Sequence, residues 1–348
     1  MRLPFGLDQL EERAREHLSR GAQGYFSDAA YSDAAGLFTT ARENEAAWQH
    51  WYLRPRVLVD VSEIRTETSI LGTPTRMPIL AAPCAYNAFA HPDAELAVAR
   101  ATAGVGAIHV VSTAASKPPE EIARAAAADR WFQLYSDIDA GKTDERLRMA
   151  EDVGFKAVVL TVDAPVGAPR YHGYPEQGFG PVATANVLDP GLEWGEVERI
   201  AKQTDLPLVL KGILHPADAI LAVAHGVAGV VVSNHGGRQL DGAIPTAFAL
   251  PPIVGAVDGQ IEVYVDGGVR SARDVMRALA LGARAVLIGR PYLWALAIAG
   301  EEGVRELFGR LCDELRNAMM LTGQVDVASI DRDIVVPRPG SSYASPER

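Results

Sequence analysis

The chain has 348 residues, 48% of them hydrophobic, with a formal net charge of −11 and a pI near 5.3. A surface this acidic repels phosphates, which argues against nucleic acid and anionic membranes as partners. No apolar run approaches the roughly 20 residues of a membrane helix, and no apolar secretory signal opens the sequence. Two cysteines, Cys84 and Cys312, are too few for a disulfide framework or a thiolate metal site. We therefore expect a cytoplasmic globular protein with no metal.

Residues 1–76 precede the first regular strand and are predicted to form a helical N-terminal extension, because they begin with a charged amphipathic stretch. Helix-length segments then alternate with eight short apolar runs, at 77–83, 107–112, 131–135, 156–163, 206–212, 228–235, 261–268 and 284–290. Runs this uniformly apolar fit strands of a parallel sheet that is covered on both faces. Eight β–α units in one chain predict an α/β fold, a (β/α)8 TIM barrel over 77–322, within a single domain of residues 1–348.

Two segments depart from this alternation. The connection 164–205 is the longest between predicted strands and is rich in glycine, proline and aromatic residues. Because loops that follow the strands of such a barrel build its active site, this connection is a candidate lid. The tail 336–348 contains several proline and serine residues and is predicted to be mobile.

Polar side chains gather where six successive predicted strands end. They are Gln133 and Tyr135, Thr161 and Asp163, Lys211, Ser233 to His235, Asp266 to Gly268, and Gly289 with Arg290. Any single one of them could be a satisfied core residue. Six sets on one rim instead predict an active site, because the carboxyl ends of barrel strands all face the same way.

Two patterns on this rim indicate particular chemistry. The glycine-rich turns before Arg270 and before Arg290 fit a phosphate held by backbone N–H groups and arginines, although ordinary tight turns look the same. His235 and Arg238 lie three residues apart among glycines. A histidine suits a general base and an arginine grips a carboxylate at two points, whereas the alternative is a capping histidine beside a surface arginine.

The run SNHGGRQLDGA at 233–243 resembles the FMN-dependent 2-hydroxy-acid oxidases and dehydrogenases, which include glycolate, lactate and mandelate oxidases. The resemblance extends through 82–101, 132–135, 160–165, 206–213, 265–270 and 281–291. It implies FMN as cofactor and oxidation of a small-molecule 2-hydroxy acid, with oxygen as the acceptor and hydrogen peroxide as product. A homotetramer or homo-octamer is also implied.

The same resemblance implies a role for each matching residue. The catalytic set comprises the base His235, its partner Asp163, the carboxylate ligands Arg238 and Arg170, and Tyr135 on the substrate oxygen. The ring of FMN would be lined by Pro83, Cys84, Ala85, Ser112, Gln133, Thr161 and Ser233, with Lys211 at its N1–C2 carbonyl edge. Its ribityl chain and phosphate would be bound by Asp266, Gly267, Gly268, Arg270, Gly289 and Arg290.

Three departures from the family pattern bear on the substrate. Either Tyr25 or Tyr31 matches the N-terminal tyrosine that contacts the substrate carboxylate. Ala114 stands where members that act on short acids often carry an aromatic residue, and the connection from Arg170 to Trp194 is short. Both favour an aromatic or bulky, mandelate-like acid. A dehydrogenase with a quinone or protein acceptor, a flavin-dependent isomerase and a barrel without catalysis stay open as alternatives.

Overall fold

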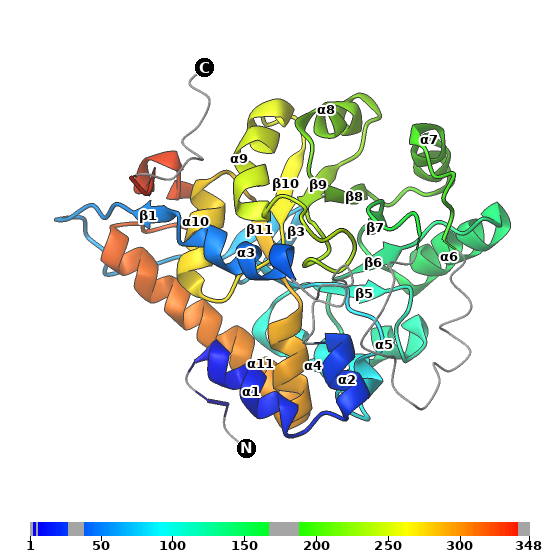
Figure 1. The fold of residues 1–348 in the computed structure, drawn as a ribbon, viewed down its shortest axis with the longest axis horizontal. Coiled ribbons are helices and arrows are strands. Elements are labelled where there is room, and N and C mark those ends of the chain that lie inside the picture. Colours follow the sequence, from blue (N-terminus) through cyan, green and yellow to red (C-terminus); the bar gives the residue numbers. More distant parts are fainter. Residues whose placement is uncertain (1–2, 5, 27–37, 167–187, 340–348) are drawn as a thin grey trace.

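The structure is a computed structural model that describes residues 3–4, 6–26, 38–166 and 188–339 (Figure 1). Eight parallel strands form a closed barrel in chain order, with the last strand paired to the first. They are β4 (Ile79–Ala81), β5 (His109–Ser112), β6 (Arg130–Leu134), β7 (Val158–Thr161), β8 (Leu208–Ile213), β9 (Gly229–Val232), β10 (Glu262–Val265) and β11 (Ala285–Ile288). Each one overlaps a predicted run, so the predicted barrel is confirmed.

A helix follows every barrel strand. These helices are α4 (Ala94–Val105), α5 (Pro119–Ala125), α6 (Ala140–Val153), α7 (Trp194–Gln203), α8 (Pro216–Ala224), α9 (Thr246–Val257), α10 (Ala272–Ala280) and α11 (Arg290–Thr322). The 3₁₀ turn η1 (Asn87–Phe89) precedes α4, and η2 (Val327–Ser329) and η3 (Arg332–Ile334) follow α11. Connections of this kind keep neighbouring strands parallel and bring their carboxyl ends to one rim.

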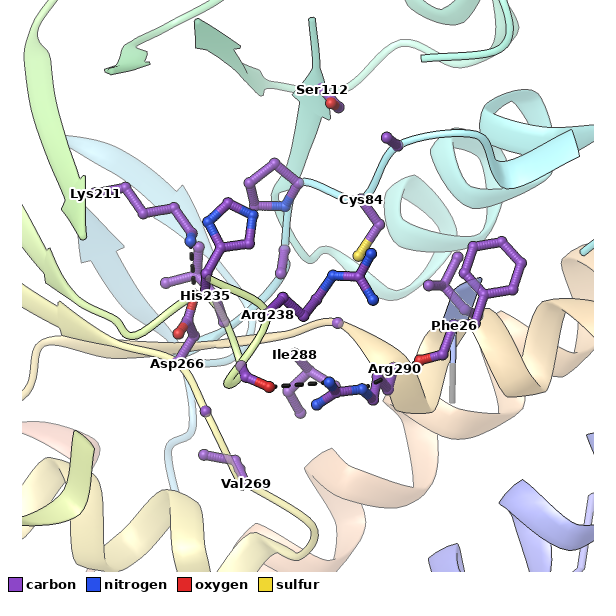
Figure 2. Close-up of a pocket in the computed structure, with 18 of the residues that line it drawn as sticks. Phe26, Cys84, Ser112, Lys211, His235, Arg238, Asp266, Val269, Ile288 and Arg290 are labelled. Carbon is purple, nitrogen blue, oxygen red and sulfur yellow. Dashed lines mark hydrogen bonds and ion pairs between the residues drawn. The ribbon is translucent and has the colours of Figure 1, made fainter. Parts of the chain in front are cut away.

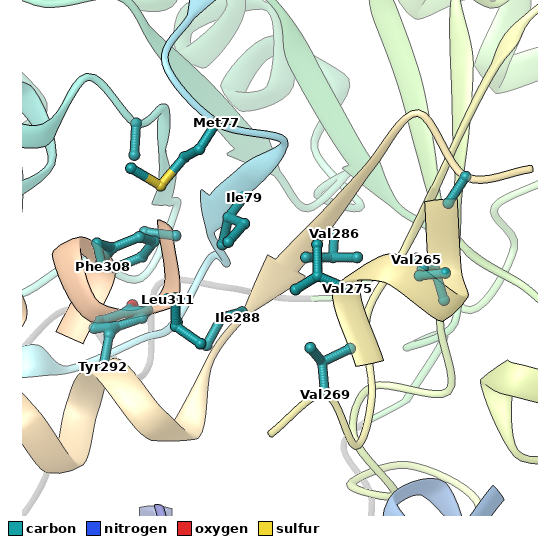
Figure 3. Close-up of a cluster of buried hydrophobic side chains, with 14 of the residues drawn as sticks. Met77, Ile79, Val265, Val269, Val275, Val286, Ile288, Tyr292, Phe308 and Leu311 are labelled. Atoms are coloured by element: carbon teal, nitrogen blue, oxygen red, sulfur yellow. The ribbon is translucent and has the colours of Figure 1, made fainter. Parts of the chain in front are cut away.

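The barrel strands are apolar on both faces because each face meets a different part of the core. Inward-facing Leu80, Val110, Trp131, Val159, Val231 and Tyr264 belong to one buried cluster inside the barrel. Outward-facing side chains pack against the helices, as Figure 3 shows for Ile79 and Ile288 beside Tyr292 and Phe308 of α11. The alternation along each strand is that of a pleated strand buried on both faces.

The extension is helical only in its first part, so the prediction of a helical segment up to residue 76 is wrong beyond Trp48. It contains α1 (Leu7–Arg15), α2 (Arg20–Phe26) and α3 (Thr39–Trp48), and then β1 (Trp51–Leu53), β2 (Thr68–Ile70) and β3 (Thr73–Thr75). Leu71 and Gly72 link β2 to β3 with φ of 46° and 75°. Positive φ at both central residues is the geometry of a tight two-residue hairpin. Ile70 joins the core inside the barrel, which gives the hairpin its anchor.

The start of the predicted mobile tail is paired rather than loose. Strand β12 (Val335–Pro337) lies antiparallel to β1, with Trp51 opposite Pro337. The pairing gives the backbone groups of this segment hydrogen-bond partners that the sequence pattern did not indicate. Residues 340–348 and the part of the candidate lid at 167–187 lie outside the described residues. Among the described residues, no helix is long and apolar enough to cross a membrane.

Candidate active site

A cavity lies at the carboxyl ends of the barrel strands, and Figure 2 shows most of the side chains around it. Residues at the carboxyl ends of β5 and β11 and from the loops after β4, β6, β9, β10 and β11 line it, together with Lys211 of β8, the start of α11 and the end of α2. The predicted site residues among them are Tyr25, Pro83, Cys84, Ala85, Ser112, Tyr135, Lys211, His235, Arg238, Asp266, Gly267, Gly268, Arg270, Gly289 and Arg290. The polar rim inferred from the sequence is therefore one continuous site.

His235 forms a hydrogen-bonded pair with Asp163, as the resemblance implied. Their Nδ1 and Oδ1 atoms are 2.9 Å apart. Burial alone would raise the pKa of Asp163, but the charges of His235 and Lys211 and the hydrogen bond lower it overall. A Cβ at Gly212 would lie 2.5 Å from the Cβ of Asp163, so the carboxylate position depends on a glycine there. The pair is thus a buried carboxylate held against one nitrogen of the imidazole, which leaves Nε2 for chemistry.

Lys211 is a buried cation beside the cavity. Its Nζ donates to Ser233 Oγ at 2.9 Å. It also lies 3.3 Å from Asp266 Oδ2 (Figure 2). Burial would lower the pKa of Lys211, but the carboxylates of Asp266 and Asp163 outweigh it and the net shift is upward. The lysine therefore stays charged at neutral pH. Among the described residues, Asp266 Oδ1 has no hydrogen-bond partner, which leaves an acceptor for a ligand donor.

Arg238 lies between the base-bearing turn and α2. Its guanidinium donates to the carbonyl of Tyr25 at 2.6 Å and stacks 4.8 Å from the centre of the Tyr25 ring. Tyr135 also lines this end of the cavity, and burial together with the nearby Asp163 carboxylate raises its pKa, so the phenol keeps its proton. A phenol donor and a planar cation at one end of a cavity suit an oxygen-bearing carboxylate ligand.

Positive charge continues from Arg238 to Arg290, whose guanidinium donates to the carbonyls of Phe26 and Gly236 at 3.1 and 2.9 Å. Gly289 precedes α11 and Arg290 is its first residue, so the positive end of a helix faces this region. Arg270 pairs with Glu45 at 2.7 Å. Burial and the charges of Arg238 and Arg270 lower the pKa of Arg290 to about 10. Three guanidinium groups that repel one another favour the binding of an anion between them.

Three predicted ring-lining residues stand behind the cavity wall rather than on it. Gln133 and Thr161 are buried and joined by a 2.9 Å hydrogen bond, and Ser112, which does line the cavity, donates to Gln133 Oε1 at 3.2 Å. Ser233 is likewise buried and accepts a hydrogen bond from Lys211, which lines the cavity. These residues orient the groups at the wall.

An aromatic cluster adjoins the cavity through Tyr25, which lines it, whereas Tyr86 and Phe89 do not. Tyr25 lies edge-on to Tyr86 and Phe89, with ring centres 5.7 and 6.0 Å away. Ala114 is buried and its carbonyl accepts the N–H of Tyr86 at 3.1 Å, but it does not line the cavity. Ala114 therefore adds no space to this cavity.

The structure describes one of the residues that the sequence left open. Of the two candidate tyrosines, Tyr25 lines the cavity, whereas Tyr31 and Arg170 lie outside the described residues. Lining residues that the sequence analysis missed are Phe26, Ala82, Gly236, Val269, Leu287, Ile288 and Leu293. Several of them are direct neighbours of predicted residues, which was the available signal. Most are apolar or glycine and carry no chemical pattern of their own.

Comparison with known proteins places these features in a family. The profile of the FMN-dependent dehydrogenase family matches residues 14–179 and 174–337. An L-lactate oxidase from Nostoc sp. is 42% identical, with 94% of this chain and 97% of that protein covered. A 4-hydroxymandelate oxidase from Amycolatopsis orientalis is 44% identical over 83% of this chain and 87% of its own. A solved mandelate oxidase with (S)-4-hydroxymandelic acid has a TM-score of 0.89 at 38% identity, covering 96% and 98% of the two chains.

Proposed function

This chain belongs to the family of FMN-dependent dehydrogenases and oxidises a 2-hydroxy acid to the 2-oxo acid, and we propose that its preferred substrate is an (S)-2-hydroxy acid with an aromatic or bulky side chain. The observation that carries the proposal is the cluster of Tyr25, Tyr86 and Phe89 beside Arg238. A carboxylate on the arginine would place the remainder of the substrate near the Tyr25 ring, which packs against Tyr86 and Phe89. The resemblance to solved mandelate oxidases, one of them with (S)-mandelic acid, supports the same substrate class.

The residues present fit FMN. The glycine turn at Gly267 and Gly268, the start of α11, and the mutually repelling Arg270 and Arg290 suit a phosphate dianion. At the other end, the buried charge of Lys211 suits the pyrimidine edge of the ring. When bound there, FMN supplies the acceptor for the two electrons that leave the substrate.

The mechanism follows from the geometry around His235. Arg238 would hold the substrate carboxylate by two parallel hydrogen bonds, and the Tyr135 phenol would donate to a substrate oxygen. Because Nδ1 of His235 already faces Asp163, its Nε2 would take the proton from the substrate. The buried Asp163 carboxylate would then stabilise the imidazolium. The positive charge of Lys211 would favour negative charge arriving on the ring.

We infer that oxygen is the electron acceptor, which gives hydrogen peroxide. The curated relatives named as oxidases support this choice over a quinone or protein acceptor. Turnover in an oxygen electrode should consume one oxygen for each peroxide formed. Turnover that needs an added quinone would assign a dehydrogenase instead. A cytoplasmic location and a homotetramer or homo-octamer stay predictions from the sequence.

The deciding experiment is anaerobic addition of glycolate, L-lactate and (S)-mandelate to the purified holoenzyme while the flavin absorbance is followed. We expect (S)-mandelate to bleach the flavin faster than the two short acids. Faster bleaching by glycolate would overturn the bulky-substrate proposal. No bleaching by any hydroxy acid would overturn the assigned reaction and favour an isomerase, which leaves the flavin oxidised after each turnover.

A further inference from the structure

We propose that Asn44, on helix α3 of the N-terminal extension, is a positioning residue that fixes the turn carrying the base His235, and that it acts through Asn234. The inference rests on the proposed role of His235 in proton transfer. It assigns part of the catalytic geometry to a segment that lies about 190 residues earlier in the chain and outside the barrel.

The two asparagines form a reciprocal amide pair. Asn44 Nδ2 donates to Asn234 Oδ1, Asn234 Nδ2 donates to Asn44 Oδ1, and both distances are 2.8 Å. Both side chains are buried, with 1% and 4% of their surface exposed. Asn234 Oδ1 also accepts the N–H of Gly237 at 3.2 Å, and its Nδ2 also donates to the carbonyl of Ile244 at 3.1 Å. Asn234 Oδ1 thus accepts two hydrogen bonds and its Nδ2 donates two.

The turn that Asn234 holds is not one that the backbone prefers. His235, Gly236 and Gly237 have φ of 58°, 65° and 74°, three left-handed residues in succession. Left-handed backbone is strained for a residue that carries a Cβ, so the turn persists only because surrounding contacts determine it. The Asn234 side chain spans the turn by accepting from Gly237, and Asn44 in turn fixes the plane of that amide.

Helix α3 contacts the turn directly as well. A Cβ on Gly237 would lie 2.9 Å from the backbone nitrogen of Ala41, so helix and turn are in van der Waals contact. The Asn44–Asn234 pair therefore lies in a packed interface between α3 and the turn, where the two segments have little room to move. Loss of the Asn44 amide would release the plane of Asn234, and with it the direction in which the imidazole presents Nε2. The His235 imidazole would still bind Asp163, but the backbone turn that carries it would no longer be fixed.

Asn44 has a second set of contacts that the substitution would leave in place. Its backbone oxygen packs against Gly268, where an added Cβ would lie only 2.1 Å away. The Trp48 indole, one turn later on α3, donates to the carbonyl of Gly267 at 2.9 Å. The Asn44 side chain itself adds only a 3.3 Å approach of its Nδ2 to an added Cβ at Gly267 and a hydrogen bond from the Thr246 N–H at 3.2 Å, so truncation should leave the main support of the phosphate turn in place. The proposal therefore predicts slow flavin reduction with FMN binding retained.

The test uses holoenzyme carrying Asn44→Ala. A second variant, Asn44→Ser, is a smaller perturbation because it keeps a polar group for the Thr246 N–H, which in the wild type donates to Asn44 Oδ1 at 3.2 Å. Gln324→Ala is the matched control, since it also removes a buried amide, one that bonds only near the end of α11. Anaerobic stopped flow with the best hydroxy acid should show flavin reduction about 10- to 100-fold slower in both Asn44 variants and within twofold of wild type in the control.

Two further measurements separate positioning from loss of structure. The Kd of FMN for the apoproteins should stay within about threefold of wild type, whereas amide hydrogen exchange in a peptide covering 233–240 should be faster in the Asn44 variants only. A double-mutant cycle with His235→Gln completes the test. Addition of Asn44→Ser to His235→Gln should slow reduction by less than twofold, because two residues that act through one group are not additive.

Each outcome has one meaning. Slow reduction with normal FMN affinity, faster exchange at 233–240 and non-additivity supports the proposal. Reduction at the wild-type rate in Asn44→Ser, or full additivity with His235→Gln, overturns it while the proposed function stands. Loss of FMN in both Asn44 variants also overturns it, since the side chain would then support the phosphate turn. If His235→Gln alone reduces its flavin at the wild-type rate, it is the proposed function that fails.

Discussion

The 2.9 Å hydrogen bond between His235 and Asp163 sets the direction in which this site can move a proton. His235 occupies a left-handed conformation directly after a buried strand, and Ser233 Oγ accepts its backbone N–H at 3.1 Å. The imidazole is thus fixed by its own backbone and by the carboxylate. Proton abstraction beside an anchored carboxylate follows if Nε2 faces the substrate.

Replacement of His235 with glutamine should remove the base without removing the flavin. A positioned base contributes about 10²–10⁴-fold to a rate, so we expect anaerobic flavin reduction to slow at least about 100-fold. The variant should still purify with FMN and should bind a substrate analogue, measured as a spectral shift of the flavin. Wild-type reduction kinetics in this variant would remove His235 from the mechanism.

Asp163→Asn should give an intermediate rate. The lowered pKa of Asp163 keeps it ionised, so the amide removes a negative charge but keeps the shape of the side chain. The base remains, yet its protonated form loses its partner. Stopped-flow reduction should therefore fall between wild type and His235→Gln. A rate below that of His235→Gln would instead assign the carboxylate a role independent of the histidine.

Arg238→Lys should lose far more than affinity, because a lysine keeps the charge but cannot form two parallel hydrogen bonds. The stack on Tyr25 would be lost too. Loss of one charged hydrogen bond costs about 1.5–3 kcal/mol, which corresponds to about 10- to 150-fold in kcat/KM. Steady-state kinetics with (S)-mandelate measure this effect. A variant within twofold of wild type would place the substrate carboxylate elsewhere.

At the scale of elements, helix α3 packs against two turns of the barrel rim, the turn after β9 at Gly237 and the turn after β10 at Gly268. Its Asn44 backbone packs on Gly268 and the Trp48 indole binds the Gly267 carbonyl. The turn after β10 is thus formed by a strand from the barrel and a helix from the extension. This contact explains why the phosphate turn needs glycine, beyond its φ of 74°.

Gly268→Ala should therefore weaken FMN binding. The methyl group would meet the Asn44 carbonyl oxygen and would also force a non-glycine residue into left-handed backbone. We expect the Kd of FMN, titrated by quenching of flavin fluorescence, to rise at least about tenfold. Gly259→Ala is the matched control, since Gly259 has φ of 70° but nothing within 4 Å of an added Cβ. Equal effects of the two substitutions would contradict a specific contact with α3.

At the scale of the whole molecule, the barrel buries a histidine, His109, that does not line the cavity. His109 begins β5 with 1% of its surface exposed, and among the described residues its Nδ1 has no hydrogen-bond partner. Burial and the charge of Arg130 lower the pKa of His109 from 6.5 to about 3. In the unfolded chain the His109 imidazole is protonated below about pH 6.5, whereas in the folded chain it is protonated only below about pH 3.

The sign of the effect follows directly. Stability from His109 is complete above its unfolded pKa and falls as the pH drops from about 6.5 toward 3, by up to about 1.4 kcal/mol per pH unit. His109→Leu should remove this contribution, so its free energy of unfolding should fall less steeply with acidification. Urea titrations of both holoenzymes between about pH 7 and pH 5 measure the two slopes. Parallel slopes would show that folding does not lower the pKa of His109.

The sequence by itself determined the barrel and most of its rim. Eight apolar runs separated by helical patterns leave few topologies, because parallel strands need crossover helices and their carboxyl ends meet at one edge. The residues at those ends, from Lys211 to Arg290, were therefore assigned to one site, and fifteen of the predicted residues do line one cavity. The catalytic and cofactor roles drew in addition on the resemblance around 233–243.

Only the tertiary structure decided how the extension meets the barrel. The pairing of β1 with β12, the contact of α3 with Gly268 and the Asn44–Asn234 pair join residues that lie some 190 to 290 positions apart. Local pattern carries no information on such contacts, because a buried asparagine on an amphipathic helix looks like any other polar position until its partner is known. That Tyr25 lines the cavity and that Ala114 does not depend on the same packing, which fixes side-chain direction and not only sequence order.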